Sequence, residues 1–143
     1  MARRNQPLTV RLADVTQSLV DHEARRTRRS RGAIVGELAE EAAKMRLFPG
    51  IAFRGPDPRR PWVIGSGLDV WEIVSMHRDY EGNLKRLLSA HPSLSERPVR
   101  LALAYADRFP EEVEEAITDN ERSLEEWLQE LPTASVTRVS RTR

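Results

Sequence analysis

Polar and apolar residues alternate strictly over residues 8–12, near the start of the chain. In an extended backbone, successive side chains point to opposite faces, so this pattern predicts a short strand. Thr9 and Arg11 fall on the polar face of that strand. The apolar face consists of Leu8, Val10 and Leu12.

Two helices are predicted to follow the strand. Asp14, with Gln17 three residues later, is typical of a capping-box start for a helix over about residues 15–27. Ser30 is predicted to cap a second helix, whose apolar positions recur with helical spacing over about residues 31–46. The first 46 residues therefore read as strand, helix and helix.

Residues 47–68 are rich in proline and glycine, which interrupt helices. Within them, IAFR (51–54) and WVI (62–64) are typical of two short strands joined by a turn. We expect a small β-hairpin here.

The remainder of the chain is predicted to be helical. Asp69 opens one helix with a D-x-x-E pattern, and residues 81–90 carry leucines at helical spacing. Ser95 is the expected N-cap of the next helix, and Pro110 sits in the first turn of a last helix that we expect to run to about Leu131.

These elements predict a mainly α protein with short β segments. We expect a first module over residues 1–46 and a linker with a hairpin over 47–68. The next part is expected to be a helical bundle for dimerisation or partner docking over 69–131. The chain is expected to end in a basic flexible tail over 132–143. A single strand with two helices is too small to bury a sufficient core alone, so we expect a homodimer or a higher oligomer.

Composition narrows the class of protein. The 143 residues contain no cysteine, so disulfides and thiolate metal sites are excluded. The chain has no run of 18 apolar residues and no apolar segment of the kind found in signal peptides. We therefore expect a soluble cytoplasmic protein without a membrane association.

Charge is segregated along the chain although the net charge is only +1. Residues 1–32 carry a net charge of +5, and residues 107–131 carry −8. A polyanion such as double-stranded DNA would be attracted to the first segment and repelled by the second.

The N-terminal third resembles the ribbon-helix-helix family of DNA-binding proteins. The resemblance rests on TVRL (9–12), AD (13–14) and RTRRSRGAIVGELAEEA (26–42). It implies that two chains pair their strands into a ribbon that enters the major groove, while the start of the second helix binds phosphate. One departure is Arg28, which stands where the family usually has glycine. The resemblance implies these DNA-binding residues: Thr9, Arg11, Arg28, Arg29, Ser30 and Arg31. The alternative is that the arginine-rich turn is only a solvated loop.

The second half resembles the domain-of-unknown-function family numbered 433. The matching motifs are GSGLDVWEIV, HPSLSERPVRLALAYA and FPEEVEEAI, which lie within residues 49–118. This resemblance implies a helical bundle like a helix-turn-helix and an antitoxin of the VapB type. The implied partner is a PIN-like ribonuclease toxin.

The C-terminal tail suggests how such a toxin would be inhibited. PIN-type nucleases hold a divalent metal among carboxylates, and an inserted arginine would pair with those carboxylates. Arg138 and Arg141 are the candidates in the tail, and Trp127 is the candidate on the last helix. The alternative is that the tail is simply solvated.

An enzyme is not expected, and neither is a cofactor. The chain has three scattered histidines, no glycine-rich phosphate loop and no serine in a nucleophile motif. Two function classes remain. The first is an antitoxin that also represses its own operon, and the second is a plain dimeric transcriptional regulator without a toxin partner.

Overall fold

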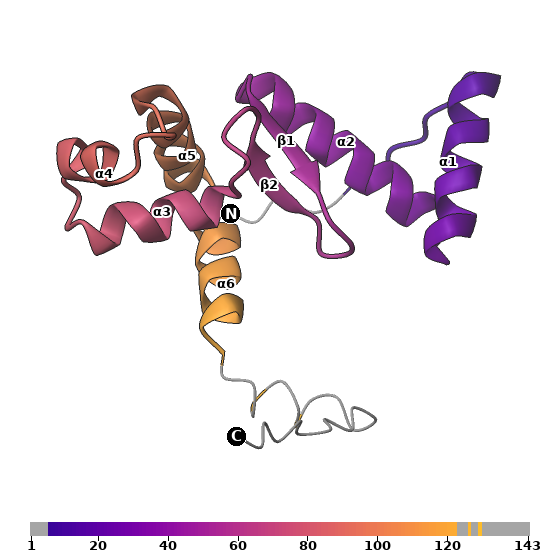
Figure 1. Ribbon diagram of the computed structural model, residues 1–143. Helices are drawn as coiled ribbons and strands as arrows, with labels where there is room; N and C mark the ends of the chain where they lie inside the picture. Colours follow the sequence, from indigo (N-terminus) through magenta and orange to yellow (C-terminus); the bar gives the residue numbers. More distant parts are fainter. Residues whose placement is uncertain (1–5, 123–125, 127–128, 130–143) are drawn as a thin grey trace, which may run out of the picture. The chain divides into compact units, whose positions relative to one another are not determined.

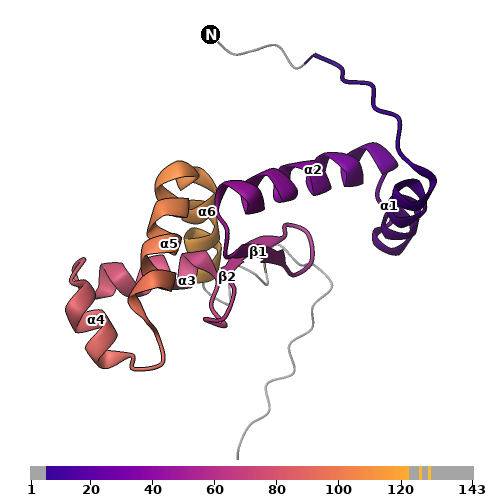
Figure 2. The ribbon, with the colours of Figure 1, turned by 90° about the horizontal axis from the view of Figure 1, so that it is seen from above.

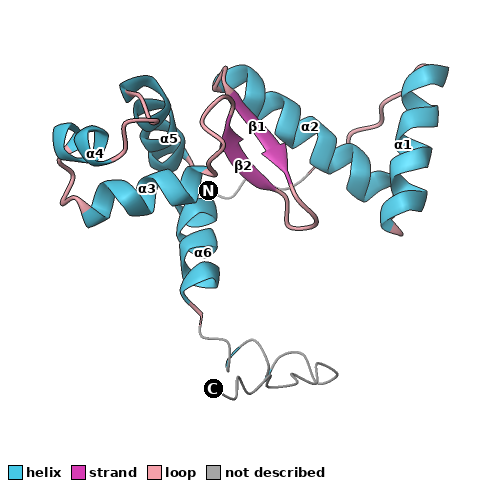
Figure 3. Cartoon of the chain, in the orientation of Figure 1, coloured by secondary structure: helices cyan, strands magenta, loops and turns pink. Residues whose placement is uncertain are grey.

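The structure is a computed structural model that describes residues 6–122, 126 and 129. In this part of the chain it contains six helices and one two-stranded antiparallel hairpin, so the protein is mainly helical with short β segments (Figure 3). The chain divides into two compact units, Met1–Pro49 and Gly50–Arg143.

The first unit contains two helices. Helix α1 spans Asp14–Thr27 and helix α2 spans Arg31–Leu47, close to the predicted 15–27 and 31–46. Figures 1 and 2 show α1 crossing the N-terminal part of α2, so the C-terminal part of α2 extends beyond α1. The core between the two helices is correspondingly small. It consists of Val20, Ala24 and Ile34, with Leu12 and Val35 packed against them.

Two details at the start of this unit differ from expectation. The N-cap of α1 is Ala13, which makes no side-chain cap, so the predicted capping box at Asp14 is wrong. Asp14 lies instead in the first turn, where its charge complements the positive end of the helix dipole. Residues 6–13 form no regular structure in the single chain, and the expected ribbon, which needs a second chain, stays a prediction.

The second unit begins with the predicted hairpin. Strand β1 (Ile51–Arg54) pairs antiparallel with strand β2 (Arg60–Val63), which starts two residues earlier than the predicted 62–64. Gly50 precedes β1 with φ +105°, and a Cβ built there would lie 2.9 Å from Leu101 Cδ2. Glycine suits this position because side chains with a Cβ rarely adopt this φ, and a Cβ would also require the end of the Leu101 side chain to shift.

Four helices complete the second unit, and α3 lies at its centre. Helix α3 (Val70–Asp79) packs on α5 (Glu96–Arg108) and α6 (Pro110–Glu121), and α4 (Leu84–Ala90) also contacts α3. Strand β2 contacts both α3 and α5, so the hairpin is packed on the helices. The fully buried side chains of this unit include Ile51, Val70, Ile73, Leu87, Val99 and Tyr105.

The helix boundaries of this unit follow mostly from local signals. Asp69 forms the predicted capping box, and Pro110 occupies the first turn of α6 as predicted. The helix predicted over 81–90 starts later, at Leu84, because Glu81 and Gly82 adopt positive φ values of 54° and 75°.

The last helix also ends earlier than predicted. Helix α6 stops at Glu121, and Arg122 has an extended backbone with ψ 136°. An uninterrupted helix from Pro110 to Leu131 is therefore wrong at this residue. No glycine or proline marks this end in residues 117–125.

Polar side chains tie α6 to the rest of the second unit. The buried Tyr105 hydroxyl donates to the Glu112 carboxylate at 2.9 Å. The Arg60 guanidinium lies 3.7 Å from the Asp119 carboxylate and donates to the Ala116 carbonyl at 3.5 Å. These contacts fix the position of α6 against α5 and the hairpin.

Candidate nucleic-acid interface

The turn between α1 and α2 places Arg28 in a left-handed backbone conformation. Its φ and ψ are 54° and 39°, and the following Arg29 N–H donates to the Ala24 carbonyl at 3.0 Å. A left-handed residue commonly ends a helix, and glycine is the usual choice because a Cβ makes this conformation costly. Arg28 therefore carries backbone strain that a glycine would avoid.

Ser30 starts α2 immediately after this turn. Its Oγ accepts a hydrogen bond from the Ala33 N–H at 3.1 Å, as predicted for an N-cap. The first turn of α2 contains no acidic residue. A helix start of this kind attracts an anion such as a phosphate, because its N–H groups and the helix dipole both favour negative charge.

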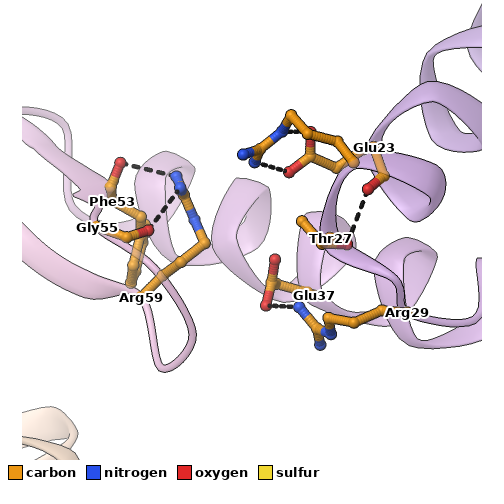
Figure 4. A network of polar contacts seen from close by, with 8 residues as sticks. Glu23, Thr27, Arg29, Glu37, Phe53, Gly55 and Arg59 are labelled. Atoms are coloured by element: carbon orange, nitrogen blue, oxygen red, sulfur yellow. Dashed lines mark hydrogen bonds and ion pairs between the residues drawn. The ribbon is translucent and has the colours of Figure 1, made fainter.

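Three of the five arginines in residues 25–31 pair with carboxylates of the same unit. The Arg26 Nε–H donates to the Glu23 Oε2 within α1, with 2.9 Å between the two atoms. This carboxylate raises the pKa of the Arg26 guanidinium, mainly through the hydrogen bond. Figure 4 shows the side chains of Arg29 and Glu37 pointing toward each other, with 2.7 Å between Nη1 and Oε2.

Arg31 makes the third of these ion pairs. Its Nε lies 2.7 Å from the Asp21 Oδ1, which joins the first turn of α2 to α1. This acid stands ten positions before its partner in the sequence, and Glu37 stands eight positions after Arg29. Sequence reasoning missed both acids, because only the packing of α1 on α2 brings them to the turn.

Arg25 and Arg28 differ from the other arginines of the turn. Both are exposed, and neither makes an ion pair with any residue that the structure describes. Among the five arginines of residues 25–31, these two therefore face solvent without a carboxylate partner among the described residues.

The predicted base-contacting residues lie in the irregular segment before α1. Thr9 and Arg11 are both exposed. Of the three alternating apolar residues, only Leu12 packs against the small core, whereas Leu8 is 86% and Val10 59% exposed. The single chain thus leaves most of the expected apolar face uncovered.

The predicted toxin-binding residues Trp127, Arg138 and Arg141 lie outside the described residues. Among residues 6–122 with 126 and 129, no group of histidine and carboxylate side chains could hold a metal ion. None of the helices in the same ranges is both long and apolar enough to cross a membrane.

Comparison with known proteins gives no relative. No family model, no curated protein and no solved structure matches this chain. The resemblances to the ribbon-helix-helix family and to the family numbered 433 therefore stay expectations.

Proposed function

We propose that the chain is a DNA-binding repressor that acts as a dimer of its N-terminal unit, and that it is also the antitoxin of a PIN-like ribonuclease. The observation that carries the DNA-binding half is the combination, in one small unit, of uncovered apolar side chains and an arginine-rich helix start. Each part of this combination needs a different partner.

Uncovered apolar surface supports a second copy as the first partner. Val15 and Leu19 on α1 are 73% and 65% exposed, whereas Val20 and Ala24 of the same helix are buried. Among the residues that the structure describes, every large apolar side chain recorded as exposed, except Ile64, precedes Pro49. A unit with so small a core is expected to be stable only when another surface covers these side chains.

The basic turn supports DNA as the second partner. Paired strands from two copies would place Thr9 and Arg11 against base edges in the major groove. The same pairing would bring two copies of the Ser30-capped helix start to the phosphates on either side. Arg11 is the residue best suited to read a base, because a guanidinium can bind guanine O6 and N7 together.

The antitoxin half of the proposal concerns the second unit and the basic tail. Among the described residues of this unit, Ile64 is the one large apolar side chain that is exposed, so this part of the unit offers little apolar surface for oligomerisation. Its function is then recognition of a different protein, and the tail arginines Arg138 and Arg141 would pair with the carboxylates of a nuclease site.

Sedimentation equilibrium and DNA binding test the first half together. We expect a mass of about twice 16.4 kDa, and binding to duplex DNA from upstream of the chain's own gene. Leu19→Asp should give a monomer that no longer binds, because it places charge in the pairing surface. Ile64→Asp is the matched control and should leave both properties unchanged. A wild-type monomer that binds DNA as tightly as a dimer would contradict the proposal.

Co-purification tests the second half. A stoichiometric small protein encoded next to this chain, whose ribonuclease activity the chain inhibits, is the expected result. Arg138→Ala with Arg141→Ala should relieve that inhibition without changing DNA binding. Recovery of the chain with DNA but without a protein partner would favour the plain regulator instead.

A further inference from the structure

We infer that Asp21 is a built-in competitor for DNA phosphate: it holds Arg31 against the protein and so limits how many arginines of the turn reach DNA. This inference rests on the proposed function, because it concerns the same helix start. It assigns to an acidic residue of α1 a role in setting DNA affinity.

The position of Arg31 is the first step of the argument. Arg31 is the first residue of α2, directly after the Ser30 cap, where a bound phosphate would lie. Its guanidinium is the cation nearest in sequence to that helix start, and it is already engaged by the Asp21 carboxylate at 2.7 Å. A carboxylate and a phosphate compete for the same donors, so Arg31 cannot serve both fully.

Solvent exposure is the second step, because it distinguishes two ion pairs of the same length. The side chains of Arg29 and Glu37 are 26% and 19% exposed, whereas those of Arg31 and Asp21 are 56% and 34% exposed. A more exposed pair is screened by water and exchanges partners more readily. Glu37 thus fixes Arg29 as part of the fold, and Asp21 holds Arg31 in a contact that phosphate can replace.

The third step is the consequence for binding. With Arg31 and Arg29 occupied, each chain offers phosphate chiefly the unpaired charges of Arg25 and Arg28. The salt dependence of binding counts the phosphates that are neutralised, with a log–log slope of about 0.9 per contact. Release of Arg31 would add one contact in each chain of a dimer.

Asp21→Asn in the full chain tests this directly. The probe is a mixed-sequence DNA duplex of about 30 base pairs, with affinity measured by fluorescence anisotropy over a series of salt concentrations. We expect the log–log slope to steepen by about 1.8 and the affinity near 0.15 M salt to rise roughly tenfold.

Two further variants separate release of Arg31 from a simple gain of charge. Glu40→Gln changes the net charge equally and removes an acid that pairs with Lys44, about 13 Å along α2 from Arg31. It should change the slope by much less. In the Arg31→Ala background, Asp21→Asn should have almost no effect, because a double-mutant cycle reports the coupling between the two residues.

Three outcomes would overturn the inference. They are an unchanged slope in Asp21→Asn, an equal change in Glu40→Gln, and an undiminished effect of Asp21→Asn in the Arg31→Ala background. If the wild type binds DNA in a salt-dependent way, each of these results removes only the competitor role of Asp21. If the wild type does not bind the duplex at any salt concentration, the proposed DNA-binding function fails as well.

Discussion

Replacement of Arg28 by glycine should stabilise the protein and weaken its DNA binding at the same time. Arg28 has φ 54°, a conformation that costs a residue with a Cβ about 1–2 kcal/mol. Glycine avoids this strain but loses about 0.5–1 kcal/mol through its greater freedom in the unfolded chain. The net gain in the free energy of unfolding should therefore be about 0.5–1 kcal/mol for each chain.

The loss of DNA affinity follows from charge rather than from the backbone. Arg28 is exposed and makes no ion pair with a described residue, so its removal takes one phosphate contact from each chain. In a dimer the log–log salt slope should become shallower by about 1.8. Arg28 would thus lower the stability of the fold and raise the affinity for DNA.

Two control substitutions separate the two effects. Arg28→Ala removes the charge but keeps a Cβ, so it should weaken DNA binding as much as glycine does without stabilising the fold. Arg28→Lys keeps the charge and should leave the salt slope nearly unchanged.

The choice of probe matters for the stability measurement. All three tryptophans lie after residue 50, so their fluorescence does not report on the first unit. Amide hydrogen exchange of α1, detected by mass spectrometry, measures the stability of the first unit. Equal protection in the glycine and alanine variants would refute the strain argument, and an unchanged salt slope in both would refute the role of Arg28 in binding.

Three other predictions concern the two units separately. Ile34→Ala removes a side chain that is 0% exposed and should cost about 2–5 kcal/mol, which would unfold α1 and α2 in circular dichroism while the tryptophan transition stays in place. Tyr105→Phe should cost about 1.5–3 kcal/mol, because the hydroxyl donates to the charged Glu112 carboxylate, and it should speed amide exchange in α6. The Arg78 guanidinium, mainly through hydrogen bonding, lowers the pKa of Glu114, so this pair contributes stability above the ordinary pKa of glutamate that is lost as the pH falls through the lowered pKa. Arg78→Ala should move the Glu114 midpoint upward in a carbon-detected NMR titration, and an unmoved midpoint would show that the ion pair does not form in solution.

Local signals predicted most of the secondary structure of this chain. Ser30 and Asp69 mark helix starts through contacts within three residues, and Pro110 marks one through its fixed φ; the structure has a helix start at each position. Signals of this range are visible in a sequence because the interacting groups are neighbours in the chain.

The sequence did not reveal features that depend on packing or on backbone conformation. The Asp21–Arg31 and Arg29–Glu37 ion pairs form only after α1 folds back on α2, so periodicity could not indicate them. The left-handed Arg28 could be suspected only because glycine is usual at this point of the resembling family. The end of α6 at Arg122 was missed because the apolar spacing continues past it.

The two units cover their apolar surface in different ways, and this difference links assembly to DNA binding. Among the described residues, Ile64 is the one exposed large apolar side chain of the second unit, whereas those of the first unit include Leu8, Val10, Val15 and Leu19. These four residues flank Arg11, the candidate for base recognition, in the chain. In the proposed dimer the surface that pairs two copies is therefore continuous with the surface that reads DNA. Any change that weakens pairing should weaken DNA binding by mass action, even where no DNA contact is lost. A substitution that loosens the dimer but leaves DNA affinity unchanged at low protein concentration would contradict this coupling.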